Sequence, residues 1–524
     1  MTGRYVVAID QGTTSTRCIV FDQLGRFVSV AQREHRQWFP QPGWVEHDAE
    51  QIWANVVKIV PVALARAGIT TSDVVALGIA NQRETAVLWD RRTGKPVGRA
   101  ITWQDTRSAA LLPELAGRDV AHAFRERCGL PLSTYATAPR LTWLLRSSPE
   151  LRRRAESGDV LFGTMETWLV WQLTGGAEAG PGVAQHVTDV TNASRTMLMD
   201  LGTLDWDDEL CAAFEVPRAM LPQVRPSAAV HGTATTVLPG VVIGAAIGDQ
   251  QAALFGQACF TPGEAKCTYG TGAFLLLNTG HTPVASTHGL ATTVAYQVGD
   301  ERAVYALEGS IAMTGSLVQW FRDGLAMVRT APEIETLAAT VDDNGGCYIV
   351  PAFSGLFAPH WRSDARGVIT GLTSYITRGH LARAVLEATA WQTADVVDAM
   401  DADSGLRLTT LRVDGGMTSN LLLMQTISDL LDVPVERPMV HETVSLGAAY
   451  AAGLTVGLWP DLAVLRRSWH RGASWAPAMP AERREAQRAG WRAALAQTLG
   501  SQAPGPEVTT TSVVTTTSAR PREP

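Results

Sequence analysis

The sequence predicts an α/β protein with two large domains around a central cleft. A chain of 524 residues is longer than a single hydrophobic core usually supports. A hairpin with small residues in its turn occurs twice, at residues 5–22 and 265–278, and a similar order of strands and helices follows each copy. Repeated alternation of strands and helices is typical of layered α/β domains, so each copy is expected to form one domain.

The two hairpins carry the first indication of function. The first has two β-branched stretches separated by Gly12 and a run of small hydroxyl residues, which predicts a strand, a tight turn and a second strand. The second has Gly270, Thr271 and Gly272 in the same place. Backbone N–H groups in glycine turns, with hydroxyls beside them, suit the oxygens of a polyphosphate. One such loop could be an ordinary turn, but two facing loops indicate a nucleotide cleft.

The remaining elements of the first half follow from local patterns. Apolar runs predict strands at residues 5–9, 17–22, 27–33, 74–81, 85–90 and 240–249. The runs at 74–81 and 85–90 have the composition of buried parallel strands. A helix is expected over residues 49–66, with Asp48 as its N-cap and Gln51 completing a capping box. Residues 102–221 are richer in helix and loop, and we expect an insertion that carries substrate contacts.

The second half repeats this order. Strands are predicted near residues 302–307, 408–416 and 434–439, and helices over 381–400, 420–431 and 445–454. The duplication places the domains at residues 1–254 and 255–500. Residues 501–524 are rich in Thr, Ser and Pro and are predicted to be a disordered tail.

Composition excludes several classes of protein. A formal net charge of -7 argues against nucleic acid as a main partner, because binding to the phosphate backbone needs a concentrated positive face. The six cysteines are far apart and lack metal-ligand spacing, which indicates buried thiols in a reducing compartment. The sequence contains neither a signal peptide nor an apolar run that could insert into a membrane, so we expect a cytoplasmic protein.

The lysines exclude one class of nucleotide site. Only Lys58, Lys95 and Lys266 are present, and none stands in the pattern G-x-x-x-x-G-K-[ST]. The G-x-S-x-G and H-E-x-x-H patterns are also missing from the sequence, which removes the commonest hydrolase signatures. Any nucleotide must therefore be held without a P-loop lysine.

Several segments resemble the FGGY family of carbohydrate kinases, and in particular its members that phosphorylate glycerol. In chain order these segments are AIDQGTTSTR, QPGWVEHD, NQRET, FGTMETWLVW, TDVTNASRTM, GDQQAALFGQ, TYGTG, YALEGS and RVDGGMTSN. The resemblance extends over residues 5–491. It implies two actin-like (ribonuclease H-like) ATPase domains around the cleft, and phosphorylation of glycerol to sn-glycerol 3-phosphate with ATP and Mg²⁺. It also implies a homo-oligomer, either a dimer or a tetramer.

Phosphoryl transfer to an alcohol needs a base, charge neutralisation and a metal ion. Asp249, at the end of an apolar strand, is a candidate general base, although it could instead cap the helix that follows. Arg17 could neutralise charge on the transferred group, or it could be a solvated strand residue. Asp10 could hold Mg²⁺ through water, or shape the loop as an Asx-turn. The resemblance favours the catalytic alternative for Asp249.

The substrate site is predicted around Arg83 and Glu84, a donor and an acceptor that follow the strand at 74–81. Ligands gather at the carboxyl ends of strands in open α/β sheets, and charged partners recognise hydroxyl groups well. The alternative is a solvated surface pair. The resemblance adds Asp249 and four further substrate residues, of which the aromatic ones could instead belong to the core: Trp103, Tyr135, Gln250 and Phe274.

The nucleotide site is predicted from both loops. Hydroxyls of Thr13, Thr14 and Ser15, together with Arg17, can bind the phosphates. The resemblance assigns Thr271 to the β- and γ-phosphates. It also assigns Gly315 and Gln319 to the wall of the site, and Gly416 and Asn420 to the adenosine region. Asn420 could instead cap the helix that it precedes, which would not exclude a ligand role.

Two other functions remain open from the sequence. One is an FGGY kinase that acts on a pentulose, gluconate or erythritol. The other is a non-catalytic, actin-like nucleotide sensor, which would have no reason to keep Asp249, Arg83 and Glu84 together. Residues 231–240 lack the glycine-rich, arginine-bearing loop linked to inhibition by fructose 1,6-bisphosphate, and we interpret His231 as an ordinary loop histidine. Residues 175–185 are expected to form an exposed inserted loop.

Overall fold

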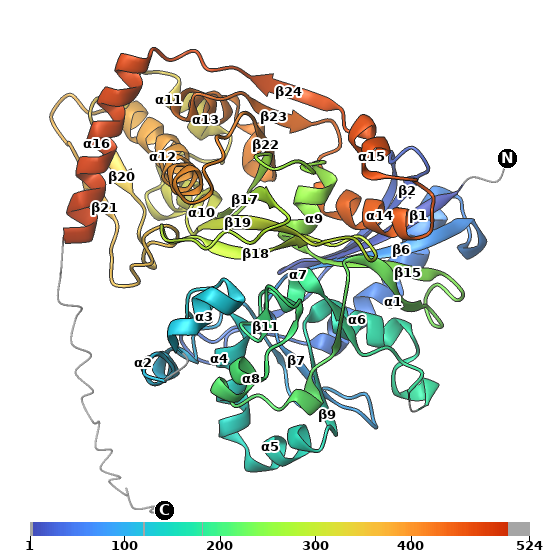
Figure 1. Cartoon of the computed structure of the whole chain (residues 1–524). Helices are drawn as coiled ribbons and strands as arrows, with labels where there is room; N and C mark the ends of the chain where they lie inside the picture. Colours follow the sequence, from blue (N-terminus) through green and yellow to red (C-terminus); the bar gives the residue numbers. More distant parts are fainter. Residues whose placement is uncertain (1–3, 119–120, 181, 501–524) are drawn as a thin grey trace, which may run out of the picture.

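The computed structural model describes residues 4–118, 121–180 and 182–500, and two large sheets dominate it (Figure 1). The first sheet has the strand order β14-β15-β6-β1-β2-β3. Its strands are β1 (Tyr5–Gln11), β2 (Ser15–Asp22), β3 (Phe27–Glu34), β6 (Val74–Asn81), β14 (Ala228–Thr233) and β15 (Val242–Gly248). The predicted tail at 501–524 lies outside the described residues.

The second sheet has the strand order β18-β19-β17-β16-β22-β23-β24. Its strands are β16 (Ala265–Tyr269), β17 (Ala273–Gly280), β18 (Ala291–Tyr296), β19 (Val304–Ile311), β22 (Leu411–Asp414), β23 (Val435–Pro438) and β24 (Arg471–Trp475). Five neighbouring strands repeat the pairing of the first sheet. In both sheets an antiparallel run of three, β3-β2-β1 or β19-β17-β16, continues into two parallel strands, β6-β15 or β22-β23. This confirms the predicted duplication, while the exact domain boundary stays a prediction.

The helix after the first hairpin shows how local sequence fixed an element. Helix α1 (Ala49–Ala67) begins where Asp48 Oδ1 accepts hydrogen bonds from the backbone N–H groups of Glu50 and Gln51, at 2.9 and 3.1 Å. It ends at Gly68, whose φ of 68° suits glycine. Only the Asp48 half of the predicted capping box forms. The Gln51 side chain accepts a hydrogen bond from the backbone N–H of Arg36 and not from that of Asp48.

Two helices join the halves of the molecule. Helix α9 (Asp249–Gly256) leaves the first sheet, and α14 (Thr443–Thr455) follows β23 of the second half yet packs on α9, β6 and β15 (Figure 1). A Cβ atom on Gly447 would lie 1.8 Å from the backbone oxygen of Ala252, so the two helix backbones touch. Only glycine permits this approach. An apolar core therefore runs between the halves.

The other helices of the second half are α10 (Gly315–Gln319), α11 (Glu333–Ala338), α12 (Arg378–Ser404), α13 (Leu421–Leu431), α15 (Leu462–Ser468) and α16 (Ala481–Gly500). Among them, α12 and α13 pack on the second sheet, and α16 packs on the separate strands β20 (Tyr348–Val350) and β21 (Val368–Thr370). Helices α12, α13 and α14 correspond to the predicted ones. Strands β18 and β24 and helices α10, α11, α15 and α16 were not among the predicted elements.

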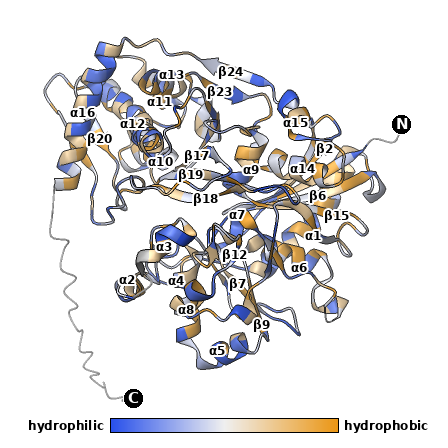
Figure 2. Cartoon of the chain, in the orientation of Figure 1, coloured by the Kyte–Doolittle hydropathy of each residue, from blue (hydrophilic) through white to orange (hydrophobic). Residues whose placement is uncertain are grey.

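The predicted insertion forms a helical region beside the first sheet (Figure 1). Its helices are α2 (Leu112–Ala116), α3 (Ala121–Cys128), α4 (Thr137–Ser147), α5 (Pro149–Glu156), α6 (Met165–Leu173), α7 (Val190–Ala193) and α8 (Asp208–Ala213). Helix α5 is strongly hydrophilic, whereas α6 is apolar and largely buried (Figure 2). The core of the insertion includes Ala291 and Tyr305 of the second half, so the insertion packs against both halves.

One predicted strand occupies a different sheet. The run at 85–90 forms β7 (Val87–Asp90), which pairs antiparallel with β9 (Val160–Gly163) and lies outside the six-stranded sheet. The strand is buried as predicted, but the prediction that it is parallel is wrong. The physical reason is Glu84, whose φ of 60° turns the chain away after β6.

Further predictions concern the cysteines, membrane insertion, His231 and the loop at 175–185. The six cysteines are free and buried, as expected. No helix among the described residues is long and apolar enough to cross a membrane.

The interpretation of His231 as a loop histidine is wrong, because it lies fully buried in β14, where burial lowers its pKa to about 4. The loop at 175–185 is only partly exposed, since Gly176 and Ala184 are buried.

Candidate active site

The predicted catalytic and substrate residues meet at one edge of the first sheet. Strands β1, β6 and β15 are parallel neighbours, and their register places Asp10 opposite Ala80, and Gly248 opposite Asn81. Asp10 lies near the end of β1, Arg83 follows β6, and Asp249 follows β15. Side chains from distant parts of the chain therefore converge at the carboxyl ends of these strands, where ligands usually bind.

Arg83 lies at the centre of this group. Its Nε is 3.3 Å from Asp249 Oδ1, and its Nη2 lies 3.3 Å from the Tyr135 hydroxyl. Both terminal nitrogens donate to the Glu308 carboxylate, with Nη2 3.0 Å from Oε1. The residue is 3% exposed. A solvated surface pair is thus excluded, and the guanidinium is fixed by bonds on several sides.

Glu84 is held by a strained turn. It is buried, and its φ of 60° is unusual for a residue with a side chain. Its backbone oxygen accepts hydrogen bonds from Arg140 Nη2 at 2.7 Å and from the Thr137 hydroxyl at 3.0 Å. Its carboxylate accepts from Arg195 Nε at 2.7 Å. Backbone strain of this kind persists where surrounding contacts enforce it, often at functional sites.

Sequence reasoning missed Glu308 and Arg195, which complete an alternating series of charges. The series runs Asp249–Arg83–Glu308–Arg195–Glu84, and we call it the charge chain. Both missed residues lie within segments that carry the family resemblance, YALEGS and TDVTNASRTM. Nothing local marks them, because their partners are more than a hundred residues away in the sequence.

Three aromatic side chains form an apolar wall beside the charge chain. The Trp103 ring lies 5.8 Å from that of Tyr135 and 6.2 Å from that of Phe274 between centroids, and both contacts are edge-on. All three residues are only partly buried, so they are not simply core. Trp103 Nε1 also donates to Thr13 Oγ1 at 3.1 Å. The wall is therefore joined to the loop of the first hairpin, which is predicted to bind phosphates.

Asp249 has the environment of a general base. It is the first residue of α9, after Gly248, and its Oδ1 accepts from the backbone N–H of Gln250 at 2.7 Å. Burial raises the pKa of Asp249, while Arg83 and Lys266 act in the opposite direction without cancelling the rise. A carboxylate with a raised pKa accepts a proton more readily near neutral pH.

Lys266 lies beside the base, although the sequence reasoning used it only to exclude a P-loop. Its Nζ donates to Gln250 Oε1 at 2.5 Å and to Thr268 Oγ1 at 2.9 Å. The side chain is buried, which lowers its pKa. Gln250, predicted to bind substrate, is thus oriented by a lysine from the second half.

The first phosphate loop is compact and closes onto itself. Gly12 N–H donates to the Ser15 backbone oxygen at 2.9 Å, and Gln32 Nε2 donates to Ser15 Oγ at 2.9 Å. Thr13 and Thr14 lie at the turn, with Thr14 exposed. Arg17, on β2, forms an ion pair of 2.8 Å with Glu442, and its side chain is 36% exposed. It is therefore neither free nor deeply buried.

The second loop gathers the predicted nucleotide residues. The Thr271 backbone oxygen accepts from the N–H groups of Thr314 and Ser316, at 3.1 and 3.0 Å. A Cβ on Gly315 would lie 2.5 Å from the Gly270 oxygen and 3.5 Å from Met417 Cγ. The start of α10 therefore touches both the loop and the turn η6 (Gly416–Ser419).

The two remaining residues that were predicted to bind the nucleotide lie at the ends of helices. Gln319 is exposed at the end of α10. Asn420 Oδ1 accepts from the backbone N–H of Leu423 at 2.8 Å, so it caps α13. The capping alternative is therefore correct for Asn420, whose amide group remains able to donate.

The residues around Asp10 fit a bound divalent cation. Burial raises the pKa of Asp10 to about 7, and Asp249 and Glu442 add to this effect while Arg17 opposes it. Carboxylates that raise one another's pKa favour a nearby cation. Within residues 4–118, 121–180 and 182–500, no group of three or more His, Cys, Asp or Glu could hold a metal ion. Asp10 would thus supply one ligand, with phosphates and water completing the shell.

The chain is similar to known proteins over almost its whole length. Glycerol kinase 2 of Streptomyces avermitilis is 61% identical over 497 residues, which cover 95% of this chain and 97% of the relative. The crystal structure of Plasmodium falciparum glycerol kinase with ADP has a TM-score of 0.88 and 38% identity, covering 95% of this chain and 98% of that one.

A third comparison shows that the fold does not select the substrate. Gluconate kinase from Lactobacillus acidophilus has a TM-score of 0.83 at 19% identity, with 95% of this chain and 99% of that one covered. This likeness shows the fold alone. Residues 5–256 match the N-terminal domain of the FGGY family of carbohydrate kinases, and residues 265–456 match its C-terminal domain. The chain therefore belongs to the FGGY family of carbohydrate kinases.

Proposed function

We propose that this protein transfers the γ-phosphoryl group of ATP to a terminal hydroxyl of glycerol, which gives sn-glycerol 3-phosphate and ADP. The observation that carries the proposal is the position of Asp249, 3.3 Å from the buried Arg83 and beside the aromatic wall. The site combines charged groups, Arg83, Glu84 and Asp249, with the aromatic wall. A short triol has this distribution of hydroxyl groups and carbon atoms, and 61% identity to a glycerol kinase supports the same substrate.

In the proposed reaction Asp249 accepts the proton of the attacking hydroxyl. The oxygen forms a bond to the γ-phosphorus while the bond to the bridging oxygen of ADP breaks. Arg83 donates to the substrate oxygens, Glu84 accepts from them, and the Tyr135 hydroxyl and Gln250 complete the set. Trp103 and Phe274 contact the carbon atoms and exclude water.

The nucleotide is proposed to lie between the two loops. Thr13, Thr14 and Ser15 donate to its phosphates from one side, and Thr271 does so from the other. Arg17 releases Glu442 and neutralises the charge that develops on the transferred group. Gly315 and Gln319 form the wall, while Gly416 and Asn420 border the adenosine. Mg²⁺ would be held by Asp10 and would neutralise phosphate charge.

Several features of the whole protein belong to the same proposal. We infer domains at residues 1–254 and 255–500, a cytoplasmic location, and a homo-oligomer that is either a dimer or a tetramer. The family relationship supports these inferences. Size-exclusion chromatography with light scattering would measure the oligomeric state, and a monomer would contradict that inference.

A coupled assay for ADP release tests the function directly. The purified protein is supplied with Mg-ATP and, separately, with glycerol, xylulose, gluconate or erythritol. Glycerol is expected to give the highest kcat/KM. Efficient turnover of xylulose with none of glycerol would reject the substrate assignment, and ATP binding without turnover of any polyol would favour a nucleotide sensor.

A further inference from the structure

We propose that Glu308 is a positioning residue for the polyol site. It holds Arg83 and Arg195 and, through them, keeps the charge chain in the geometry that receives substrate hydroxyls. The inference rests on the proposed function, because it assigns a role within the same site.

Glu308 occupies an unusual place in the charge chain. It lies on β19 of the second sheet, within the segment that matches the C-terminal family domain, whereas Arg83 and Arg195 lie in the segment that matches the N-terminal domain. Its side chain is 1% exposed. It accepts from both terminal nitrogens of Arg83, and from Arg195 Nη2 at 3.1 Å. One carboxylate therefore connects the two halves of the molecule at the substrate site.

The charges explain why this carboxylate is needed. Two buried guanidinium groups close together repel each other strongly where water is scarce. Glu308 lies between them and offsets that repulsion. Burial raises its pKa, but Arg195 and Arg83 outweigh burial and hold the pKa at about 2, so the carboxylate is ionised. Its bond to both terminal nitrogens also fixes the plane of the Arg83 guanidinium.

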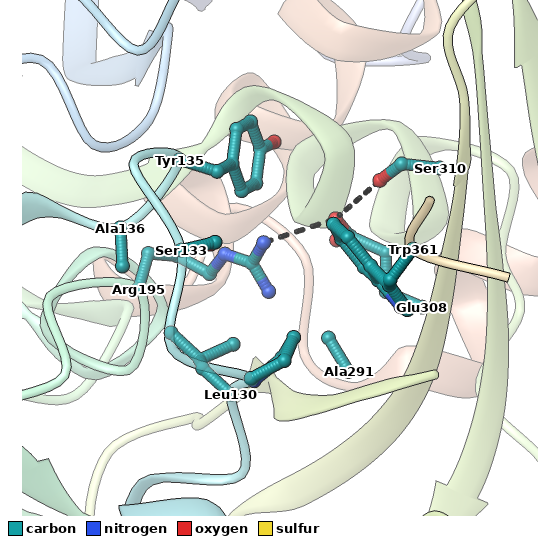
Figure 3. A pocket seen from close by; sticks show the side chains of 10 residues that line it. Leu130, Ser133, Tyr135, Ala136, Arg195, Ala291, Glu308, Ser310 and Trp361 are labelled. Atoms are coloured by element: carbon teal, nitrogen blue, oxygen red, sulfur yellow. Dashed lines mark hydrogen bonds and ion pairs between the residues drawn. The ribbon is translucent and has the colours of Figure 1, made fainter. Parts of the chain in front are cut away.

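A small pocket lies beside Arg195, where the charge chain leaves one hydrogen-bond donor without a partner among the described residues. Figure 3 shows Arg195, Glu308, Ser310 and Tyr135 around a pocket whose volume is about 10 Å³, room for about one water molecule. Arg195 Nη1 is buried and, among the described residues, has no hydrogen-bond partner. Glu308 binds the other terminal nitrogen, Nη2, and so leaves this donor directed at the pocket. The donor is available to a water molecule in this pocket.

The test compares three variants of the full-length protein. Glu308→Gln keeps the shape but removes the charge, so the KM for the polyol should rise at least about tenfold while the KM for ATP stays within about twofold. Glu308→Asp keeps the charge and should recover part of the loss. The matched control is Glu387→Gln, a buried glutamate of α12 that pairs with Arg383 and Asn344, and it should leave both KM values unchanged.

Each variant is assayed with whichever polyol the wild-type protein phosphorylates, so failure of glycerol as substrate does not decide the role of Glu308. Unchanged KM values in Glu308→Gln would overturn the proposal. So would an equal rise for polyol and ATP, or an Asp variant no better than the Gln variant. If Glu308→Gln does not fold, the KM values of Glu308→Asp test the proposal in its place. A rise confined to the polyol KM supports the role, and any other result overturns it.

Discussion

The polyol end and the nucleotide end of the site differ in how their charges are held. At the polyol end the charge chain is buried except at Asp249, whose side chain is 26% exposed, and each of its members bonds to another before any substrate arrives. At the nucleotide end Thr14, Thr271 and Gln319 are exposed, and Arg17 has only a half-exposed ion pair with Glu442. The first end is organised by the protein itself, whereas the second needs its ligand.

The difference follows from the two ligands. Glycerol is uncharged and small, so it can bind in a fixed position only if its partners already point in the right directions. A nucleotide triphosphate carries strong charge and can draw flexible groups toward itself. Preorganisation should therefore matter most for the polyol, and changes there should affect both activity and folding.

Removal of the base should have the largest effect. Asp249→Asn keeps the shape of the side chain but cannot accept a proton, so kcat should fall by about 10²–10⁴-fold. Calorimetry should show that glycerol and ATP still bind. Asp461→Asn, which changes an aspartate that caps α15, is the matched control and should retain wild-type kcat. Normal turnover in Asp249→Asn would rule out the base.

Loss of Arg83 should damage both function and stability. Arg83→Met removes the partner of the buried Glu308 and of the partly buried Asp249, and breaking a buried ion pair from one side costs about 3–5 kcal/mol. Urea unfolding should show this loss, and glycerol-dependent ADP release should disappear. A variant as stable as the wild type would mean that the charge chain is not preorganised in the way described.

Loss of Arg17 should separate activity from stability. Arg17→Gln removes a half-exposed pair, so the free energy of unfolding should change by less than about 1 kcal/mol. The kcat should nevertheless fall by about 10²-fold, because charge on the transferred group is no longer neutralised. A large loss of stability with little change in kcat would contradict the proposal that the nucleotide end is organised by its ligand and not by the protein itself.

The pH dependence should report the buried base. A carboxyl group whose pKa is raised stays protonated up to a higher pH, and a protonated Asp249 cannot accept the substrate proton. The kcat/KM should therefore fall as pH decreases, with the midpoint above the ordinary aspartate value of about 3.9. In Asp249→Asn the contribution of this group should disappear, whereas that of Asp10, whose pKa burial raises to about 7, should remain. A midpoint at or below the ordinary value would show that the base is not buried in the active state.

The smallest expected effect is a change in shape. Because the nucleotide end gains order only with its ligand, glycerol plus a non-hydrolysable ATP analogue should reduce the radius of gyration in small-angle X-ray scattering. Glycerol alone should change it less. Identical profiles with and without both ligands would contradict closure of the halves.

The sequence by itself determined the elements whose signals are local. The alternation of β-branched residues and the glycine turns predicted both hairpins, and Asp48 marked the start of α1 because capping depends on residues only a few positions apart. It also placed Asp249, Arg83 and Glu84 near the ends of strands. The resemblance then supplied the aromatic wall, which composition alone could not distinguish from core.

Only the tertiary structure decided which distant charges meet. Glu308 reaches Arg83 across 225 positions of sequence, Arg17 reaches Glu442 across 425, and no local pattern encodes either contact. The same holds for β7, which leaves the main sheet because of the turn at Glu84, and for His231, which is buried by packing around β14. Local hydrogen bonds and periodicity can be read from neighbouring residues, whereas burial and ion pairing depend on how separate elements pack together.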